Sequence, residues 1–502
     1  MIALVKRLAG ATSENFIGTW SDDFFYYLKP AMNVVAGKGA TFDGSISTNG
    51  YHPLWMLLIT LLVAVTGSGA AALFPLAFVV AATTAATFAF SQRLAARLLG
   101  TRGLASLIIA LYSTIYFYTI AKHGMEINFT VPLMMYMALR VLDGKGSLTE
   151  TRDTIATGAL SGLLVLSRTD SVIFVAMYVL AALSCRPLRP GDALRTGLCF
   201  MLGFFPVFVY LAFNIHYFGG LLPVSGAAKQ LAVGAWRHPK FRGYEFSNKL
   251  HYAFVFPVLA ANALALAVTV FGKTGEGKLE RRVGLLPILI FPQAFYLLQI
   301  CMNDWPFWDW YLYPWLAAAP IALSLSALSV PRLLRRFELW AQGAGLRRLS
   351  ALCAAAIAVA LVTVGFDYRT PIAQSSIHTF AIALTEFSKT HPGRYAMGDR
   401  AGMVGFLLPF PLLQLEGLME DRKFLDNIRK QRDLGEVLDE YGVDYYASSG
   451  AQPLGTCYRA TEPKQAGPSS PRMVGTFCQE PVLVYQDAHD RTVVFALKRA
   501  AR

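Results

Sequence analysis

The sequence has little charge for its length. Of its 502 residues, 15% are charged and 55% are hydrophobic, and the mean hydropathy is +0.43. A soluble chain of this size carries more charge, so the composition indicates a membrane protein. The formal charge of +13 is not gathered into a basic domain, so nucleic acid is not an expected partner. The chain also lacks an internal repeat and the His and Cys spacing of a zinc site.

Apolar runs of the length that a helix needs to cross a bilayer explain the hydrophobicity. Lipid offers no hydrogen-bond partners to the backbone, so these runs should be helical. The long runs are 72–92, 104–121, 126–142, 196–218, 250–271, 283–301, 311–330 and 350–366, and the shorter ones are 53–67, 154–167 and 171–185. The expected fold class is therefore mainly α and polytopic, with about 10 or 11 spans.

Basic clusters in the loops between the runs predict the orientation, because Lys and Arg accumulate on the cytoplasmic side. The clusters are Arg93/Arg97/Arg102, Lys145/Arg152, Arg186/Arg189/Arg195, Lys273/Lys278/Arg281/Arg282 and Arg332/Arg335/Arg336/Arg347/Arg348. The loops expected outside are 22–52, 122–126, 167–170, 219–249, 302–310 and everything after 366. This alternation requires the runs 154–167 and 171–185 to be half-length helices, and 53–67 to be re-entrant or strongly tilted.

The beginning of the chain does not supply the span that an outside first loop needs. Residues 1–20 contain neither an apolar span nor the core of a signal peptide. We expect that a first helix is missing before Met1, in preference to a chain that begins outside.

The tail after Phe366 reads as a small α/β domain, so the predicted domains are 1–52, 53–366 and 367–502. Its expected strands are Tyr395–Gly398, Leu412–Leu415, Tyr445–Ala447, Val482–Tyr485 and Val493–Leu497. Its expected helices are Glu420–Lys430 and Leu434–Tyr441. The segment from Gly455 to Pro471 is expected to be a loop. If the domain is extracytoplasmic, Cys457 and Cys478 are free to form a disulfide, a pairing that the sequence leaves open.

Two adjacent acids, Asp22 and Asp23, precede a short helical pattern. Apolar residues at helical spacing, followed by glycines, predict an amphipathic helix on the membrane surface. The apolar face consists of Phe24, Tyr27, Ala31 and Val34, and the glycines are Gly37 and Gly39. Asp22 suits a helix N-cap, but a second acid is more than a cap requires.

A series of short fragments resembles C-type glycosyltransferases of the GT-C fold, multi-spanning enzymes that use lipid-phosphate-linked sugars. Their order is most similar to the mycobacterial terminal arabinofuranosyltransferase family and its bacterial relatives, and more distantly to protein O-mannosyltransferases and aminoarabinose transferases. The fragments are S-D-D at 21–23, G-K-G-A-T-F-D-G at 37–44, T-N-G-Y-H-P-L-W at 48–55, H-G-M-E at 123–126, S-R-T-D at 167–170, G-G-L-L-P-V-S-G-A-A-K at 219–229, W-Y-L-Y-P at 310–314, G-D-R-A-G-M-V-G-F at 398–406 and L-E-G-L-M-E-D at 415–421. The sequence departs from the pattern at Thr169, where relatives often carry proline.

The resemblance implies an inverting glycosyltransferase of the bacterial inner membrane. It would move a sugar from a polyprenyl-phosphate donor to an envelope glycan, lipid or protein acceptor on the outer side. The family's catalytic acid falls at Asp22, with Asp23 second, since an ionised carboxylate can take the acceptor proton. Lys229 matches the family's lysine and suits the leaving phosphate, and Tyr51 and His52 are candidates for donor binding. A surface lysine and a buried structural histidine are the alternatives.

Further ionisable residues at predicted membrane edges are site candidates, because charge is costly there unless it is paired or functional. They are Glu126, Lys122, His123, Arg168, Asp170 and Asp309. Alternatively, Glu126 simply pairs with Lys122, Arg168 and Asp170 neutralise each other, and Asp309 belongs to an interfacial aromatic belt.

A divalent cation is left open as a cofactor. Asp22, Asp23 and Glu126 would offer oxygen ligands that suit Mg²⁺, Mn²⁺ or Ca²⁺. Two other functions also stay open, a transporter or flippase and a non-catalytic glycan-assembly factor. The absence of a repeat argues against the first of these, and independence from Asp22 would mark the second.

Overall fold

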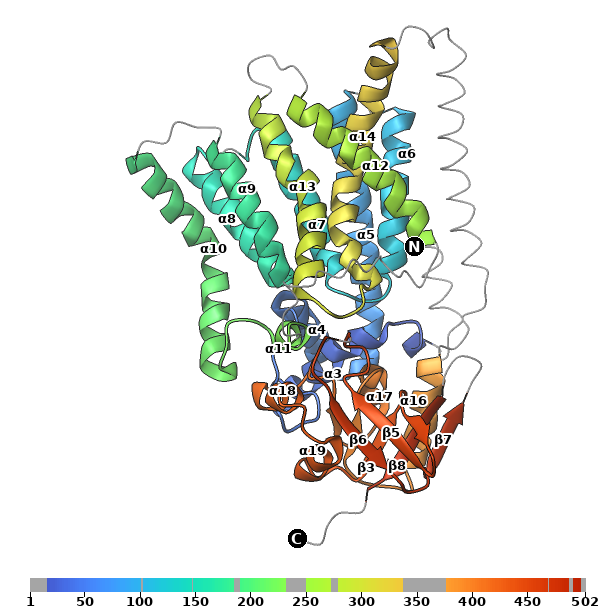
Figure 1. Ribbon diagram of the computed structural model, residues 1–502. Coiled ribbons are helices and arrows are strands. Elements are labelled where there is room, and N and C mark those ends of the chain that lie inside the picture. The colour runs from blue at the N-terminus through green and yellow to red at the C-terminus, as the bar shows by residue number, and fades with distance from the viewer. Residues whose placement is uncertain are drawn as a thin grey trace.

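The structure is a computed structural model. It describes residues 16–100, 103–146, 148–184, 190–231, 250–271, 279–336, 376–467, 469–486 and 491–497. A bundle of long helices carries a small α/β domain at one end (Figure 1). Six of the described helices are long and apolar enough to cross a membrane, which confirms a mainly α, multi-pass fold. The predicted run 350–366 and the region before residue 16 lie outside the described residues.

The helices of the bundle follow the predicted apolar runs, because the length of such a run largely determines where a membrane helix begins and ends. Their bounds are α5 Gly69–Leu99, α6 Leu104–Ala121, α7 Ile127–Leu142, α10 Pro190–Phe218, α12 Leu250–Phe271, α13 Leu279–Met302 and α14 Tyr313–Arg336, the last preceded by the 3-10 turn η3 Asp309–Leu312. The helix α7 is shorter than the six candidate spans.

Two shorter helices form a hairpin that reverses at the end of the bundle nearest the α/β domain (Figure 1). They are α8 (Thr151–Ser167) and α9 (Val172–Ser184), joined by the turn η2 (Thr169–Ser171). At about 1.5 Å per residue they extend about 25 and 20 Å, less than the hydrocarbon core of about 30 Å. The structure therefore agrees with two half-length helices that meet at residues 168–170.

Residues 22–52, which were predicted to lie outside and are called the first outer segment below, lie between the bundle and the α/β domain (Figure 1). It contains the turn η1 (Asp22–Phe24) and the helix α3 (Phe25–Val35), and α4 (Pro53–Thr66) follows it. The helix α4 has 14 residues and extends only about 21 Å, so it is too short to cross the bilayer upright. This agrees with the expectation that 53–67 does not span fully.

The surroundings of α3 differ from the expected surface helix with one apolar face. It packs against α4 on one side and against the helix α17 (Ala401–Leu407) of the α/β domain on another. Consequently Tyr26, Leu28 and Asn33 are buried together with Tyr27 and Ala31. The sequence pattern did not reveal this because the covering helix comes from a distant part of the chain. As predicted, the helix ends before Gly37 and Gly39, whose φ angles of 76° and 78° favour glycine.

The α/β domain has two sheets, drawn in orange and red in Figure 1. The first has the order β2-β1-β3-β8-β7, in which β1 is parallel to both neighbours and the other pairs are antiparallel. The second, β4-β5-β6, is antiparallel. The elements are α16 Ser376–Ser388, β1 Tyr395–Met397, β2 Leu412–Gln414, α18 Arg422–Arg429, α19 Leu434–Glu440, β3 Tyr445–Ser448, β4 Gln452–Leu454, β5 Cys457–Glu462, β6 Met473–Phe477, β7 Leu483–Gln486 and β8 Arg491–Ala496.

The expectation of a loop from Gly455 to Pro471 was wrong for its first half. The strand β5 lies within it and pairs with β4 through a tight turn at Gly455, whose φ is 60°. Its residues C-Y-R-A-T-E are mostly polar, so they carried no strong strand signal, and pairing with both neighbours determines their conformation. Cys457 and Cys478 form a disulfide that joins the ends of β5 and β6.

Close contacts hold the α/β domain against the first outer segment. A Cβ placed on Gly50 would lie 1.9 Å from the carbonyl oxygen of Leu418, so only glycine fits. Nearby, Arg394 forms an ion pair with the buried carboxylate of Asp43. The two regions therefore approach at backbone distance, and their separation is set by a residue without a side chain.

We expect Gly50→Val to push the α/β domain away from the first outer segment. The change should destabilise the protein by about 1–3 kcal/mol, the usual cost of overpacking. The measurement is the thermal unfolding midpoint of the purified protein in detergent, together with its rate of limited proteolysis. Gly197→Val in α10 is the control, because a Cβ there meets no atom within 4 Å. Equal midpoints for the two variants would contradict the prediction.

Candidate functional site

A cavity of about 70 Å³ lies where the bundle, the first outer segment and the α/β domain meet. Titratable residues from five separate parts of the chain line it, alongside Tyr26 and Tyr27 of α3. They are Asp23, His52, Glu126, Arg168, Lys229 and Tyr311. The structure thus brings together five of the residues that the sequence singled out, up to 206 positions apart between Asp23 and Lys229 (229 − 23).

The two adjacent aspartates have different surroundings. Asp23 lines the cavity, whereas Asp22 accepts hydrogen bonds from the backbone N–H groups of Gly402 and Met403, at 3.1 and 2.7 Å. These groups belong to the first turn of α17, so Asp22 caps a helix of the α/β domain. It does not cap its own turn, because the Ser21 hydroxyl does that. Of the two aspartates, Asp23 is therefore the one that faces the cavity.

Burial perturbs both carboxyl groups. Desolvation is the largest cause of the raised pKa of Asp23, which is about 6, and the charge of Lys229 opposes it. Desolvation likewise raises the pKa of Asp22 to about 7, against the two backbone hydrogen bonds from α17. A carboxyl group with a pKa near 6 is mostly ionised at neutral pH and is a stronger base than an ordinary aspartate.

Lys229 provides a cation in the same cavity. Its ammonium group donates a hydrogen bond to the Tyr311 hydroxyl at 3.0 Å. Burial lowers the pKa of Lys229, but Tyr311 and Asp23 outweigh that effect and leave the pKa raised, so the amine is charged. The lysine ends α11 (Val224–Lys229), which is anchored where the Val224 N–H donates to the Asn49 side chain at 2.9 Å. Both partners of that anchor belong to the motifs that predicted the site.

At one wall of the cavity, Arg168 connects two acids in a hydrogen-bonded network. Its guanidinium donates to Glu126 at 2.5 Å and to Asp170 at 3.1 and 2.7 Å. Tyr27 also donates to Glu126, at 2.9 Å, and Tyr313 donates to Asp170, at 3.0 Å. The pairing of Arg168 with Asp170 is therefore present as expected, and Glu126 has Arg168 as its ion-pair partner.

The other predicted residues lie at or beyond the edge of this network. The His52 ring is 3.8 Å from Glu126 and, at 3.5 Å, accepts a long hydrogen bond from the backbone N–H of Thr169. Burial lowers the pKa of His52, so the ring is neutral at pH 7. Tyr51, Lys122, His123 and Asp309 are not among the residues that line the cavity. Tyr51 lies near Tyr210 of α10 instead.

Three residues that sequence reasoning had not assigned to the site take part in it, namely Tyr27, Tyr311 and Tyr313. The last two stand in the fragment W-Y-L-Y-P, where their alternate spacing lets both rings meet the Arg168 guanidinium, at 5.5 and 4.5 Å. That fragment was the available signal. Tyr27 belonged to the expected apolar face of α3, and only the approach of the α6–α7 turn gives its hydroxyl a role.

Two of the three proposed oxygen ligands are directed to partners within the protein. Glu126 already holds Arg168 and Tyr27, and Asp22 is directed to α17. Among the described residues, no group of three or more His, Cys, Asp or Glu side chains is placed to hold a metal ion.

Comparison with known proteins shows the fold. No family model and no curated protein matches the sequence. The structure is similar to that of the oligosaccharyltransferase of Archaeoglobus fulgidus, crystallised with a tethered acceptor peptide containing the NVT sequon. The TM-score is 0.51 at 12% identity, over 86% of this chain and 65% of that one.

The likeness places this chain among multi-pass membrane proteins of the GT-C fold, and the chain spans slightly less than two thirds of the oligosaccharyltransferase. The finer similarity to arabinofuranosyltransferases stays a prediction. At 12% identity the likeness shows the fold and not the activity.

Removing the central cation should disrupt the network. We expect Arg168→Met to destabilise the protein by about 3–5 kcal/mol, because it leaves the buried carboxylate of Glu126 and the partly buried one of Asp170 without a counter-charge. Thermal unfolding in detergent measures the effect. Tyr313→Phe is the milder comparison, since it removes one hydrogen bond and should cost about 1 kcal/mol. A midpoint of Arg168→Met no lower than that of Tyr313→Phe would show that the network is not structurally important.

Proposed function

We propose that this protein is an inverting membrane glycosyltransferase. It moves a sugar from a polyprenyl-phosphate donor to an envelope glycan, lipid or protein acceptor on the outer side of the membrane. The observation that carries the proposal is the pairing of a carboxylate, Asp23, with a cation, Lys229, in one cavity at the end of the bundle. The fold shared with an oligosaccharyltransferase supports it.

In the proposed reaction, Asp23 takes the proton from the acceptor hydroxyl. The acceptor oxygen forms a bond to the anomeric carbon as the bond between that carbon and the phosphate oxygen breaks. The electron pair leaves with the polyprenyl phosphate, whose added negative charge faces Lys229. Attack opposite the leaving group inverts the anomeric centre, and no covalent enzyme intermediate is needed.

The positions of Asp23 and Lys229 fit the roles of base and phosphate cation. Asp23 comes from the first outer segment, next to the α/β domain, whereas Lys229 lies at the end of α11 beside η3. Hydrogen bonding to Tyr311 fixes the lysine and leaves its other N–H groups for phosphate oxygens. The cavity of about 70 Å³ has room for about two waters, so donor binding has to widen it.

A transfer assay with purified protein in proteoliposomes tests the proposal. The probes are radiolabelled polyprenyl-phosphate arabinofuranose and polyprenyl-phosphate mannose, with extracted cell envelope as acceptor. We expect label to enter the acceptor, and Asp23→Asn to reduce the rate by at least about 100-fold, the usual contribution of a general base. Lys229→Met should reduce kcat/KM by a similar factor, because it removes a charge that meets the leaving phosphate.

Three variants distinguish the two possible bases and the competing functions. Asp192→Asn, an exposed acid at the other end of the bundle, is the control and should transfer normally. Asp22→Asn should weaken the contact with α17 and lower activity less than Asp23→Asn does. The opposite ranking would return the role of base to Asp22. Label that crosses the membrane without reaching the acceptor would favour a transporter, and transfer unaffected by both aspartate variants would favour an assembly factor.

The rate should depend on pH in the direction that a base requires. Below a pKa of about 6 Asp23 holds a proton and cannot accept one, so transfer should fall on the acid side and level off above it. Measured kcat/KM against pH should show this rise in the wild type. The residual activity of Asp23→Asn should lack it, and an unchanged rise in that variant would assign the titration to another group.

A further inference from the structure

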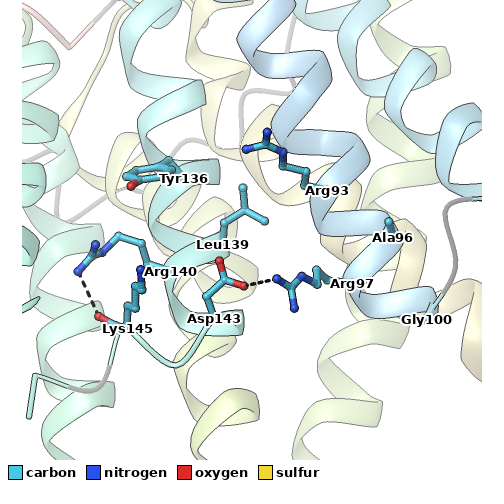
Figure 2. A pocket seen from close by; sticks show the side chains of 9 residues that line it. All are labelled: Arg93, Ala96, Arg97, Gly100, Tyr136, Leu139, Arg140, Asp143 and Lys145. Atoms are coloured by element: carbon cyan, nitrogen blue, oxygen red, sulfur yellow. Dashed lines mark hydrogen bonds and ion pairs between the residues drawn. The ribbon is translucent and has the colours of Figure 1, made fainter.

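A second cavity, of about 590 Å³, lies between the carboxyl-terminal ends of α5 and α7. Figure 2 shows Arg93 and Arg97 of α5 facing the end of α7, with Asp143 between the helices. Arg140 and Lys145 also line it. Nothing in the proposed reaction uses these residues, although they gather four positive charges around one hollow.

The cavity lies far from the candidate functional site, at the opposite end of the bundle (Figure 1). The first residue of α5, Gly69, lies against Phe406 of the α/β domain. The helix has 31 residues and extends about 46 Å. Arg93 directly follows the apolar run 72–92, so its guanidinium falls where the hydrocarbon core ends and the headgroup layer begins.

The charges of the cavity do not cancel within the protein. Arg97 pairs with Asp143 at 2.9 Å, and Arg140 pairs with Asp153 at 3.3 Å. Among the described residues, no ion pair involves Arg93 or Lys145. Four cations and two acids leave a surplus of two positive charges (4 − 2).

Arg140 is held by the protein, whereas the other cations are accessible. The Arg140 guanidinium donates to the Lys145 carbonyl oxygen and to Asp153 and Thr157 of α8. Arg93, Arg97 and Lys145 are exposed, so their charged groups can reach a ligand in the cavity.

We propose that this cavity binds the phosphate headgroup of an anionic phospholipid from the leaflet opposite the α/β domain. Guanidinium groups match phosphate oxygens in shape and charge, and basic pockets between membrane helices suit such headgroups. A lipid fits better than a soluble phosphate because apolar side chains continue the lining at the hydrocarbon edge. Leu139 is one of them, and Tyr136 is 38% exposed beside it.

Native mass spectrometry of the detergent-solubilised protein tests this proposal independently of transfer activity. The protein is incubated with phosphatidylglycerol or phosphatidylcholine of the same chain length. We expect phosphatidylglycerol to be retained in preference. The double change Arg93→Gln and Arg97→Gln should weaken its binding about 25-fold, or about fivefold for each arginine near the surface. The control is Arg152→Gln, an exposed arginine of α8 outside the cavity, which should bind as the wild type does.

Other results would overturn the proposal. Equal retention of the two lipids by the wild type would do so, as would a double variant that still prefers phosphatidylglycerol. Displacement of the lipid by an equal concentration of inorganic phosphate would assign the cavity to a soluble ligand. If the double variant does not fold, the wild type alone decides, because preferential binding must also weaken as salt concentration rises.

Discussion

The buried guanidinium of Arg168 is the interaction on which the site depends. A buried charge is tolerated only when it is paired and hydrogen-bonded, and Arg168 meets that condition with acids from its own turn and from the α6–α7 turn. Tyrosines from α3 and from the start of α14 complete the network. Four segments that are distant in the sequence therefore have to meet at one point, and the cavity is the space that remains beside it.

The charged residues inside this network have different surroundings from the two charged residues beside it. Glu126 and Asp170 are satisfied by Arg168 and by tyrosine hydroxyls, which suits them to holding segments in place. Asp23 and Lys229 stand outside it and share the cavity. Both can change partners during a reaction without exposing an unpaired ion in the core, because neither is bound to the arginine. The proposed assignment of base and phosphate cation follows from this difference in surroundings.

The α/β domain is part of the site. It covers α3, approaches the first outer segment at Gly50 and binds Asp22 through the first turn of α17. One aspartate of the pair is thus held by the domain, and its neighbour faces the cavity. A single peptide unit joins the two aspartates, so the domain binds the chain directly beside the residue that lines the cavity.

The sequence alone determined the multi-pass helical architecture, the half-length hairpin at residues 168–170 and most strands of the tail, because the length and periodicity of apolar runs are local properties. It also pointed to Glu126 and Arg168, since charges near predicted membrane edges are rare and costly, and the resemblance of its motifs to C-type glycosyltransferases pointed to Asp23, His52 and Lys229. Only the tertiary structure decided which aspartate faces the cavity, which partner Glu126 takes, and that C-Y-R-A-T-E becomes the strand β5. Those outcomes depend on groups that arrive from distant parts of the chain, and no local pattern records which distant group will supply a hydrogen bond or a counter-charge.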